Sequence, residues 1–109
     1  MEELDWFIRV MKETFDLTIT EADIGYEGVE LFVDEIDQAL VPAEYLEDVP
    51  DALLFETMLV YDSKGNDWLG AIALHPETKE WLMQVILKNG QSVYRKKVNE
   101  NEVINGDIE

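Results

Sequence analysis

The sequence predicts one α+β domain. It comprises an N-terminal amphipathic helix, a short acidic strand and a second short helix, then a four-stranded antiparallel β-meander with the helices packed on or beside the sheet. Three observations predict this class. Apolar residues near the N-terminus recur at the period of a helix, and from Leu53 onward the period changes to the two of a strand. Short turn-forming connections separate the strand-like runs, which favours antiparallel neighbours.

The first element is an amphipathic helix over residues 3–15. Its apolar residues share one stripe, and the charged residues lie off it. Such a stripe usually packs on a sheet, and we expect the same here. The stripe comprises Leu4, Phe7, Ile8, Met11 and Phe15.

Residues 16–51 give weaker signals. Short apolar alternations, interrupted by Gly25 and Gly28, indicate one or two short strands before residue 42. Pro42 occupies the expected first position of a short helix and Glu44 lies in its first turn, as helix N-termini prefer. Pro50 ends this second helix.

The remainder predicts the meander. Four runs rich in β-branched, aromatic and aliphatic residues span residues 53–61, 68–74, 81–87 and 92–98. The last connection contains Asn89-Gly90, a strong hairpin signal. Residues 99–109 are polar and acidic with little periodicity, so we expect a frayed tail after a single domain over residues 1–98.

The charge is the most informative property for function. Fifteen Asp and Glu residues lie between Lys12 and Lys64 without one Lys or Arg, and the formal net charge is −17. Self-repulsion of this size destabilises a compact state, so the field more plausibly serves an electropositive partner. The commonest such partner is a DNA-binding protein. Direct binding to nucleic acid or to an anionic membrane is disfavoured, because both carry the same sign of charge.

The composition bounds the class of protein further. Hydrophobic residues make up 47% of the chain, which argues against disorder from too little apolar surface. The chain has no cysteine, no stretch as long as a membrane span and no N-terminal signal pattern. We expect a cytoplasmic protein that is monomeric when free, since like charges oppose self-association.

Catalysis has little support in the sequence. The one histidine, His75, lies in a predicted turn without the partners of a zinc site or a nucleophile–base pair. Carboxylates are too numerous for any pair to stand out as general acid and base. The loop from Asp62 to Asp67 faintly resembles a calcium loop, but Ala73 stands where a bidentate Glu is required. We expect a hairpin turn there, no metal or cofactor, and no enzymatic activity.

A more specific signal lies in residues 30–47, where carboxylates mix with apolar residues before and inside the second helix. Side chains two apart on a strand lie about 6.6 Å apart on one face, close to the interval between successive phosphates of a DNA strand. Carboxylates so spaced could replace phosphates in a basic groove. The alternative interpretation is a solvated acidic face that maintains solubility.

Two motifs in this order of elements resemble the uracil-DNA glycosylase inhibitor family of phages and staphylococcal elements. Residues 34–45 (DEIDQALVPAEY) are similar to the acidic strand and the Leu-Pro-x-x-Tyr helix start of the staphylococcal branch. Residues 76–81 (PETKEW) are similar to the Pro-Glu-x-Lys-x-Trp hairpin of the phage branch, and an Asn-Gly turn follows in both. The resemblance is local in sequence but spans most of the order of elements.

The resemblance implies a DNA mimic without enzymatic activity that occupies the DNA cleft of the glycosylase in a 1:1 complex. In that family, carboxylates replace the DNA backbone, and an apolar pocket between helix and sheet takes the leucine that the enzyme inserts into the minor groove. Carried onto this chain, the carboxylates are Asp34, Glu35, Asp37, Glu44, Glu47 and Glu77. The pocket residues are Leu40, Tyr45, Val49, Leu69, Ala71 and Met83.

Other functions fit the same acidic field, because the field does not name its partner. One is inhibition of a different DNA-binding protein, such as a restriction or CRISPR effector. Another is immunity against a basic toxin nuclease. A third, enzymatic use of the carboxylates, lacks a convergent site.

Overall fold

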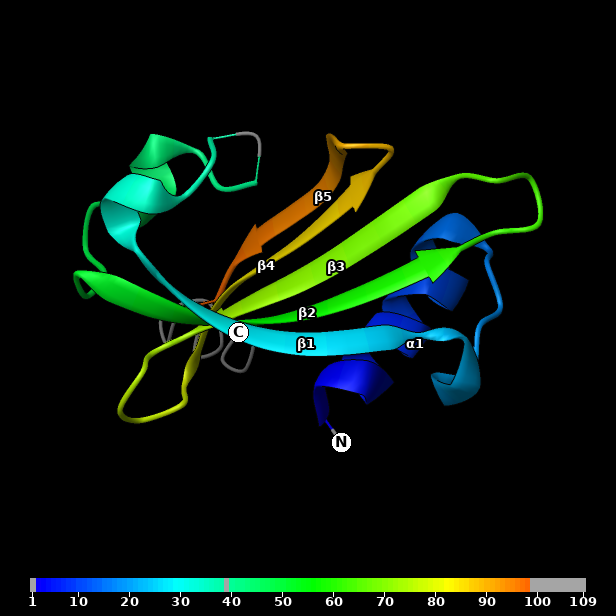
Figure 1. Ribbon diagram of the computed structural model, residues 1–109, viewed down its shortest axis with the longest axis horizontal. Helices are drawn as coiled ribbons and strands as arrows, with labels where there is room; N and C mark the ends of the chain where they lie inside the picture. Colours follow the sequence, from blue (N-terminus) through cyan, green and yellow to red (C-terminus); the bar gives the residue numbers. More distant parts are fainter. Residues whose placement is uncertain (1, 39, 99–109) are drawn as a thin grey trace, which may run out of the picture.

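The computed structural model describes residues 2–38 and 40–98. In this part of the chain one α-helix precedes a five-stranded antiparallel sheet, so the α+β prediction is confirmed (Figure 1). The elements are α1 (Glu2–Phe15), β1 (Gly25–Phe32), β2 (Ala52–Tyr61), β3 (Asp67–Leu74), β4 (Trp81–Lys88) and β5 (Gln91–Lys97). Three 3₁₀ helices lie in the connections: η1 (Glu21–Asp23), η2 (Val33–Glu35) and η3 (Ala43–Leu46). The tail predicted at residues 99–109 lies outside the described residues.

The strands lie side by side in the order of the sequence, and each pairs antiparallel with the next. This order places β1 and β5 at the two edges of the sheet (Figure 1). The two edges differ in charge. β1 carries Glu27 and Glu30, whereas β5 carries Arg95, Lys96 and Lys97.

The prediction of a four-stranded sheet was wrong, because β1 adds a fifth strand. β1 pairs with β2 from Gly25↔Leu59 to Phe32↔Ala52. Every residue of this strand is exposed except Leu31, which is half-buried, because an edge strand packs little of its surface against other elements. The alternation that identifies a half-buried strand is therefore weak here. Residues 34–37, expected to form the acidic strand, instead follow β1 as η2 and an irregular stretch.

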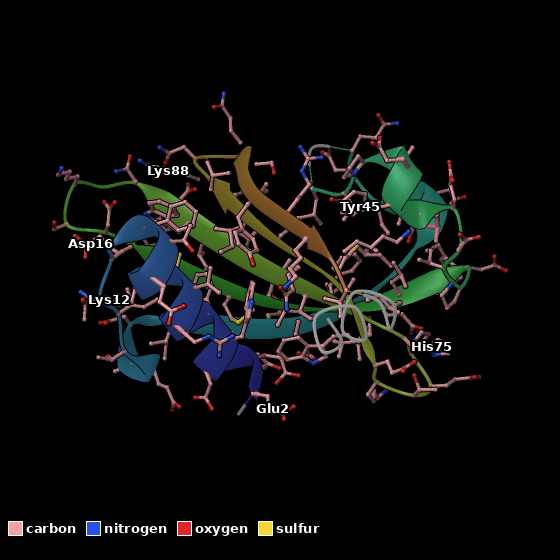
Figure 2. All side chains as sticks on the ribbon, turned by 180° about the vertical axis from the view of Figure 1, so that it is seen from behind. Glu2, Lys12, Asp16, Tyr45, His75 and Lys88 are labelled. Carbon is pink, nitrogen blue, oxygen red and sulfur yellow. The ribbon has the colours of Figure 1, made fainter. Side chains whose placement is uncertain are left out.

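α1 packs on one face of the sheet, as its apolar stripe predicted (Figure 2). The buried face is wider than that stripe, because Trp6 and Val10 are buried as well. Phe7 lies directly over Gly70 of β3, where an added Cβ would come within 2.5 Å of two ring carbons. The buried residues of α1 are Trp6, Phe7, Val10 and Met11. Among the described residues, no helix is both long and apolar enough to cross a membrane.

The connection between β1 and β2, residues 33–51 and hereafter the 33–51 segment, packs on the other face of the sheet. Its Ile36 and Val41 are buried with Phe55 of β2 and Val85 of β4. The predicted second helix is only the four-residue 3₁₀ helix η3, and Pro42 precedes it rather than occupying its first turn. Pro50 follows too closely for an α-helix to develop, because a proline disfavours helical backbone in the residue before it.

The hairpin predicted at Asn89-Gly90 is confirmed. Both residues have positive φ angles, 52° and 84°, as a type I′ turn requires. The Asn89 side chain also accepts a hydrogen bond from the Asp67 backbone N–H and donates one to Asn66 Oδ1, both at 2.9 Å. The β2–β3 and β4–β5 turns therefore support each other.

Asp62 organises the β2–β3 turn by accepting hydrogen bonds. Its Oδ1 accepts from the backbone N–H groups of Lys64 and Asn66, both at 2.9 Å. Its Oδ2 accepts from Asn66 Nδ2 at 2.9 Å and from Trp68 Nε1 at 3.1 Å. The bonds from the Asn66 and Trp68 side chains hold the pKa of the Asp62 carboxyl far below its usual range. The carboxylate thus serves a hairpin turn.

Replacing Asp62 with asparagine is expected to lower the melting temperature at neutral pH. The new NH₂ group is itself a donor, and it would face the N–H donors that now bond to the Asp62 carboxylate. A pKa lowered by folding means that the Asp62 carboxylate stabilises the fold above the pKa of the unfolded chain, about 4. This contribution is lost as the pH falls below that value. The difference in melting temperature between wild type and Asp62→Asn should therefore be widest near neutrality and shrink below about pH 4. Thermal unfolding followed by circular dichroism checks this, and a difference independent of pH would contradict it.

Candidate functional site

An acidic hollow lies where β1 ends and the 33–51 segment begins. Its volume is about 600 Å³, and it is open to solvent. The Val33 N–H donates to the Asp51 carbonyl at 2.8 Å, which ties the two ends of the segment together beside β2. Glu35 accepts a hydrogen bond from the Phe32 N–H at 3.0 Å and so fixes the start of η2. The hollow is lined by Phe32, Val33, Asp34, Glu35 and Asp51.

The hollow combines negative charge with an exposed aromatic ring. Three carboxylates line it, and Phe32 exposes 61% of its surface. An exposed aromatic side chain among carboxylates is typical of a protein-binding surface, where it supplies contact area and the charges fix the approach. This arrangement suits a partner that offers a basic or amphipathic side chain.

The structure brings together the six apolar residues that the family resemblance implied. All six belong to one cluster between the 33–51 segment and the sheet. Ala71 and Met83 are buried at its floor, with 1% and 0% of their surface exposed. The other four are half-buried and pack against the buried residues of the cluster. They are Leu40, Tyr45, Val49 and Leu69.

The six predicted carboxylates are less concentrated. Asp34 and Glu35 line the hollow. Glu44, on η3, and Glu47, directly after it, are exposed on the same 33–51 segment as Asp37, which is exposed as well. Those three do not line the hollow.

Glu77 lies apart from the hollow, in the β3–β4 turn. That turn is at the same end of the sheet as the 33–51 segment, as the positions of His75 and Tyr45 show (Figure 2). His75 Nδ1 accepts hydrogen bonds from the backbone N–H groups of Glu77 and Thr78, at 3.1 and 3.3 Å. His75 is therefore a turn residue, as its sequence context predicted. Among the described residues, no group of three or more His, Asp and Glu side chains is placed to hold a metal ion.

The carboxylates of β1 were not among the site residues predicted from the sequence, although Glu30 opens the acidic stretch at residues 30–47. Glu27 and Glu30 are exposed on the edge strand, just before the hollow. They are three residues apart and therefore point to opposite faces, so they do not reproduce the two-residue spacing expected of a phosphate-like row. The signal that could have found them is the run from Gly25 to Phe32 itself, which contains no basic residue and leads directly into Asp34.

A carboxylate of β2 is also held at this edge. The Tyr26 hydroxyl donates a hydrogen bond to Glu56. Partial burial, followed by this bond and the nearby negative charge, raises the pKa of Tyr26 above its usual value. Gly28 leaves room for the contact, because a Cβ there would lie 3.1 Å from Glu56 Oε1. The Glu56 charge is thereby fixed next to β1.

Comparison with known proteins adds no relative. No protein-family model matches the chain, and neither the curated proteins nor the solved structures contain a match.

Proposed function

We propose that this protein is a DNA mimic that inhibits uracil-DNA glycosylase by occupying the enzyme's DNA-binding cleft. It has no catalytic activity of its own in this proposal. The supporting observation is the acidic hollow beside the half-buried apolar cluster of the 33–51 segment. Together with the two motifs at residues 34–45 and 76–81, this neighbourhood of charge and apolar surface favours the glycosylase over other basic partners.

Charge governs the encounter in this mechanism. Carboxylates on β1, in the hollow and on the 33–51 segment draw the protein toward a cleft built to hold phosphates. Of the three carboxylates in the hollow, Glu35 caps η2 by accepting the Phe32 N–H. Within the described part of the chain, the side chains of Asp34 and Asp51 have no such structural role. They are available to meet basic side chains of the cleft. Steering of this kind raises the rate of association and weakens with added salt.

Apolar contact governs the lifetime of the complex. The proposal assigns Leu40, Tyr45, Val49 and Leu69 to the mouth of the pocket that receives an apolar side chain of the enzyme, above Ala71 and Met83. Burial of one such anchor in a dry pocket often contributes about 2 kcal/mol or more. Charge alone would give a weak complex that salt dissociates.

The direct test is a titration of the protein into a bacterial uracil-DNA glycosylase acting on a uracil-containing single-stranded oligonucleotide. At physiological salt we expect stoichiometric inhibition that persists when salt is added, because the apolar anchor maintains the complex. A single-stranded substrate is used because no base pair has to open, so that the assay reports only on access to the DNA-binding cleft. Absence of inhibition at large molar excess would refute the proposal.

Removing the two hollow carboxylates together, as Asp34→Asn with Asp51→Asn, is expected to slow association about tenfold at low salt and to reduce its salt dependence. Glu35 is kept because it caps η2. The matched control is Glu13→Gln with Glu21→Gln, which removes the same charge from exposed positions on α1 and η1. Stopped-flow association rates at several salt concentrations separate the two. Equal rates for both double variants would place the contact elsewhere.

A further inference from the structure

A second pocket lies on the α1 face of the sheet, away from the acidic hollow. It is shallow, has a volume of about 450 Å³, and opens between the first turns of α1 and the start of β4. Figure 2 looks onto this face, with Glu2 at the beginning of the helix. The rings of Trp6 and Trp81 meet there almost at a right angle, 83°, with centroids 6.4 Å apart. The pocket is lined by Glu2, Asp5, Trp6, Arg9, Trp81 and Gln84.

Gln84 is the unusual member of this pocket. Its side chain points to the α1 face from the middle of β4, opposite Ile72 of β3, and only 7% of the residue is exposed. Within residues 2–38 and 40–98, no hydrogen bond joins its amide to another group. No described polar atom is both fully enclosed and unpaired, so the amide remains reachable through the pocket. The amide therefore offers one carbonyl acceptor and two N–H donors to a ligand that enters the pocket.

The charges around the pocket favour a cation. Glu2 and Asp5 contribute two carboxylates and Arg9 one guanidinium, in a chain with a net charge of −17. Asp5 and Arg9 are four residues apart, yet the ion pair found among the described residues is the one between Lys12 and Asp16. The carboxylates of Glu2 and Asp5 are therefore not engaged in an ion pair with a described residue and can pair with an incoming cation.

We propose that this pocket binds the guanidinium group of an arginine side chain from a basic protein partner. The planar group can stack on the half-buried Trp81 ring, donate to the Gln84 carbonyl oxygen and donate to the carboxylates of Glu2 or Asp5. A lysine ammonium ion is more strongly hydrated and lacks the planar face, so it fits less well. Arg9 is exposed and opposes the incoming charge, which holds the affinity for one side chain near a dissociation constant of about 1 mM. The site is independent of the proposed inhibition of a glycosylase.

The test uses the full chain labelled with ¹⁵N and titrated with N-acetyl-arginine methylamide. The indole N–H signals of the three tryptophans provide an internal control, because Trp68 lies in the β2–β3 turn network and away from the pocket. We expect saturable shifts of the Trp6 and Trp81 signals and no shift of Trp68. The neutral citrulline analogue should not bind, and the lysine analogue should bind at least about threefold more weakly.

Two variants show whether the named groups are responsible. Gln84→Leu keeps a side chain of similar size without the amide, so it should fold as wild type does and should weaken arginine binding at least about fivefold. Asp5→Asn should also weaken binding, whereas Glu13→Gln, on the same helix outside the pocket, should not. Equal shifts with arginine and citrulline, tighter binding of an N-acetyl-aspartate analogue at Arg9, or unchanged affinity in both Gln84→Leu and Asp5→Asn would overturn the proposal.

Discussion

Gly70→Ala is expected to destabilise the fold by about 3 kcal/mol, at or above the upper end of the usual range for overpacking. The new Cβ would lie 2.5 Å from two ring carbons of Phe7, which is fully buried and has no space to turn. The backbone cannot retreat easily either, because Gly70 pairs with Met58 on one side and Ile86 on the other. Urea unfolding followed by tryptophan fluorescence measures the change.

The matched control is Gly25→Ala on the edge strand. There the new Cβ would meet only the Leu59 carbonyl oxygen, at an ordinary contact distance of 3.8 Å. The change should be neutral or slightly stabilising, since alanine has less freedom than glycine in the unfolded chain. Adding Phe7→Leu to Gly70→Ala should restore part of the lost stability. A Gly70→Ala protein as stable as wild type would show that α1 does not press on β3.

Tyr45→Ala is expected to shorten the lifetime of the proposed complex with uracil-DNA glycosylase about thirtyfold, equivalent to about 2 kcal/mol, with little effect on association. Tyr45 is half-buried against the apolar cluster, and the proposal assigns its ring to the contact with an inserted side chain. Dissociation rates measured by competition with excess labelled inhibitor check this result. Leu40→Asp should act in the same direction, because it places a charge in the pocket.

Tyr61→Ala is the control for Tyr45→Ala. Tyr61 is the last residue of β2, at the end far from the 33–51 segment, and is 66% exposed. Both variants lose the same side chain, so circular dichroism and melting curves can separate loss of folding from loss of binding. A slower association rate with an unchanged dissociation rate in Tyr45→Ala would contradict the role of an apolar anchor.

The helix could be predicted because its apolar residues recur at helical spacing, and the last four strands because they are apolar and β-branched runs separated by short turn-forming connections. β2, for example, buries Leu53, Phe55, Met58 and Val60 on its two faces. β3, β4 and β5 lie within one residue of their predicted bounds at every end. β1 gave only a short alternation at Val29, Leu31 and Val33, which predicted a short strand but neither its bounds nor its pairing with β2, since a solvated edge strand does not require apolar residues at alternate positions.

Only part of the candidate site could be predicted from the sequence. The six apolar residues that the resemblance implied come from the 33–51 segment, β3 and β4, and they gather in one cluster. The acidic strand was assigned one element too late. Asp51 was missed because its approach to Asp34 depends on the closure of the 33–51 segment by the Val33 N–H, a contact that no local pattern encodes.

The placement of acidic and basic residues on opposite edges of the sheet gives the molecule an electric dipole in the plane of the sheet. Four interstrand spacings of about 4.8 Å separate β1 from β5, about 19 Å in all. This is roughly twice the screening length at physiological ionic strength, about 8 Å. Arg95, Lys96 and Lys97 therefore scarcely weaken the field in front of β1. A positively charged surface therefore exerts a torque that turns the β1 edge toward it before contact, so that approach through β5 is disfavoured.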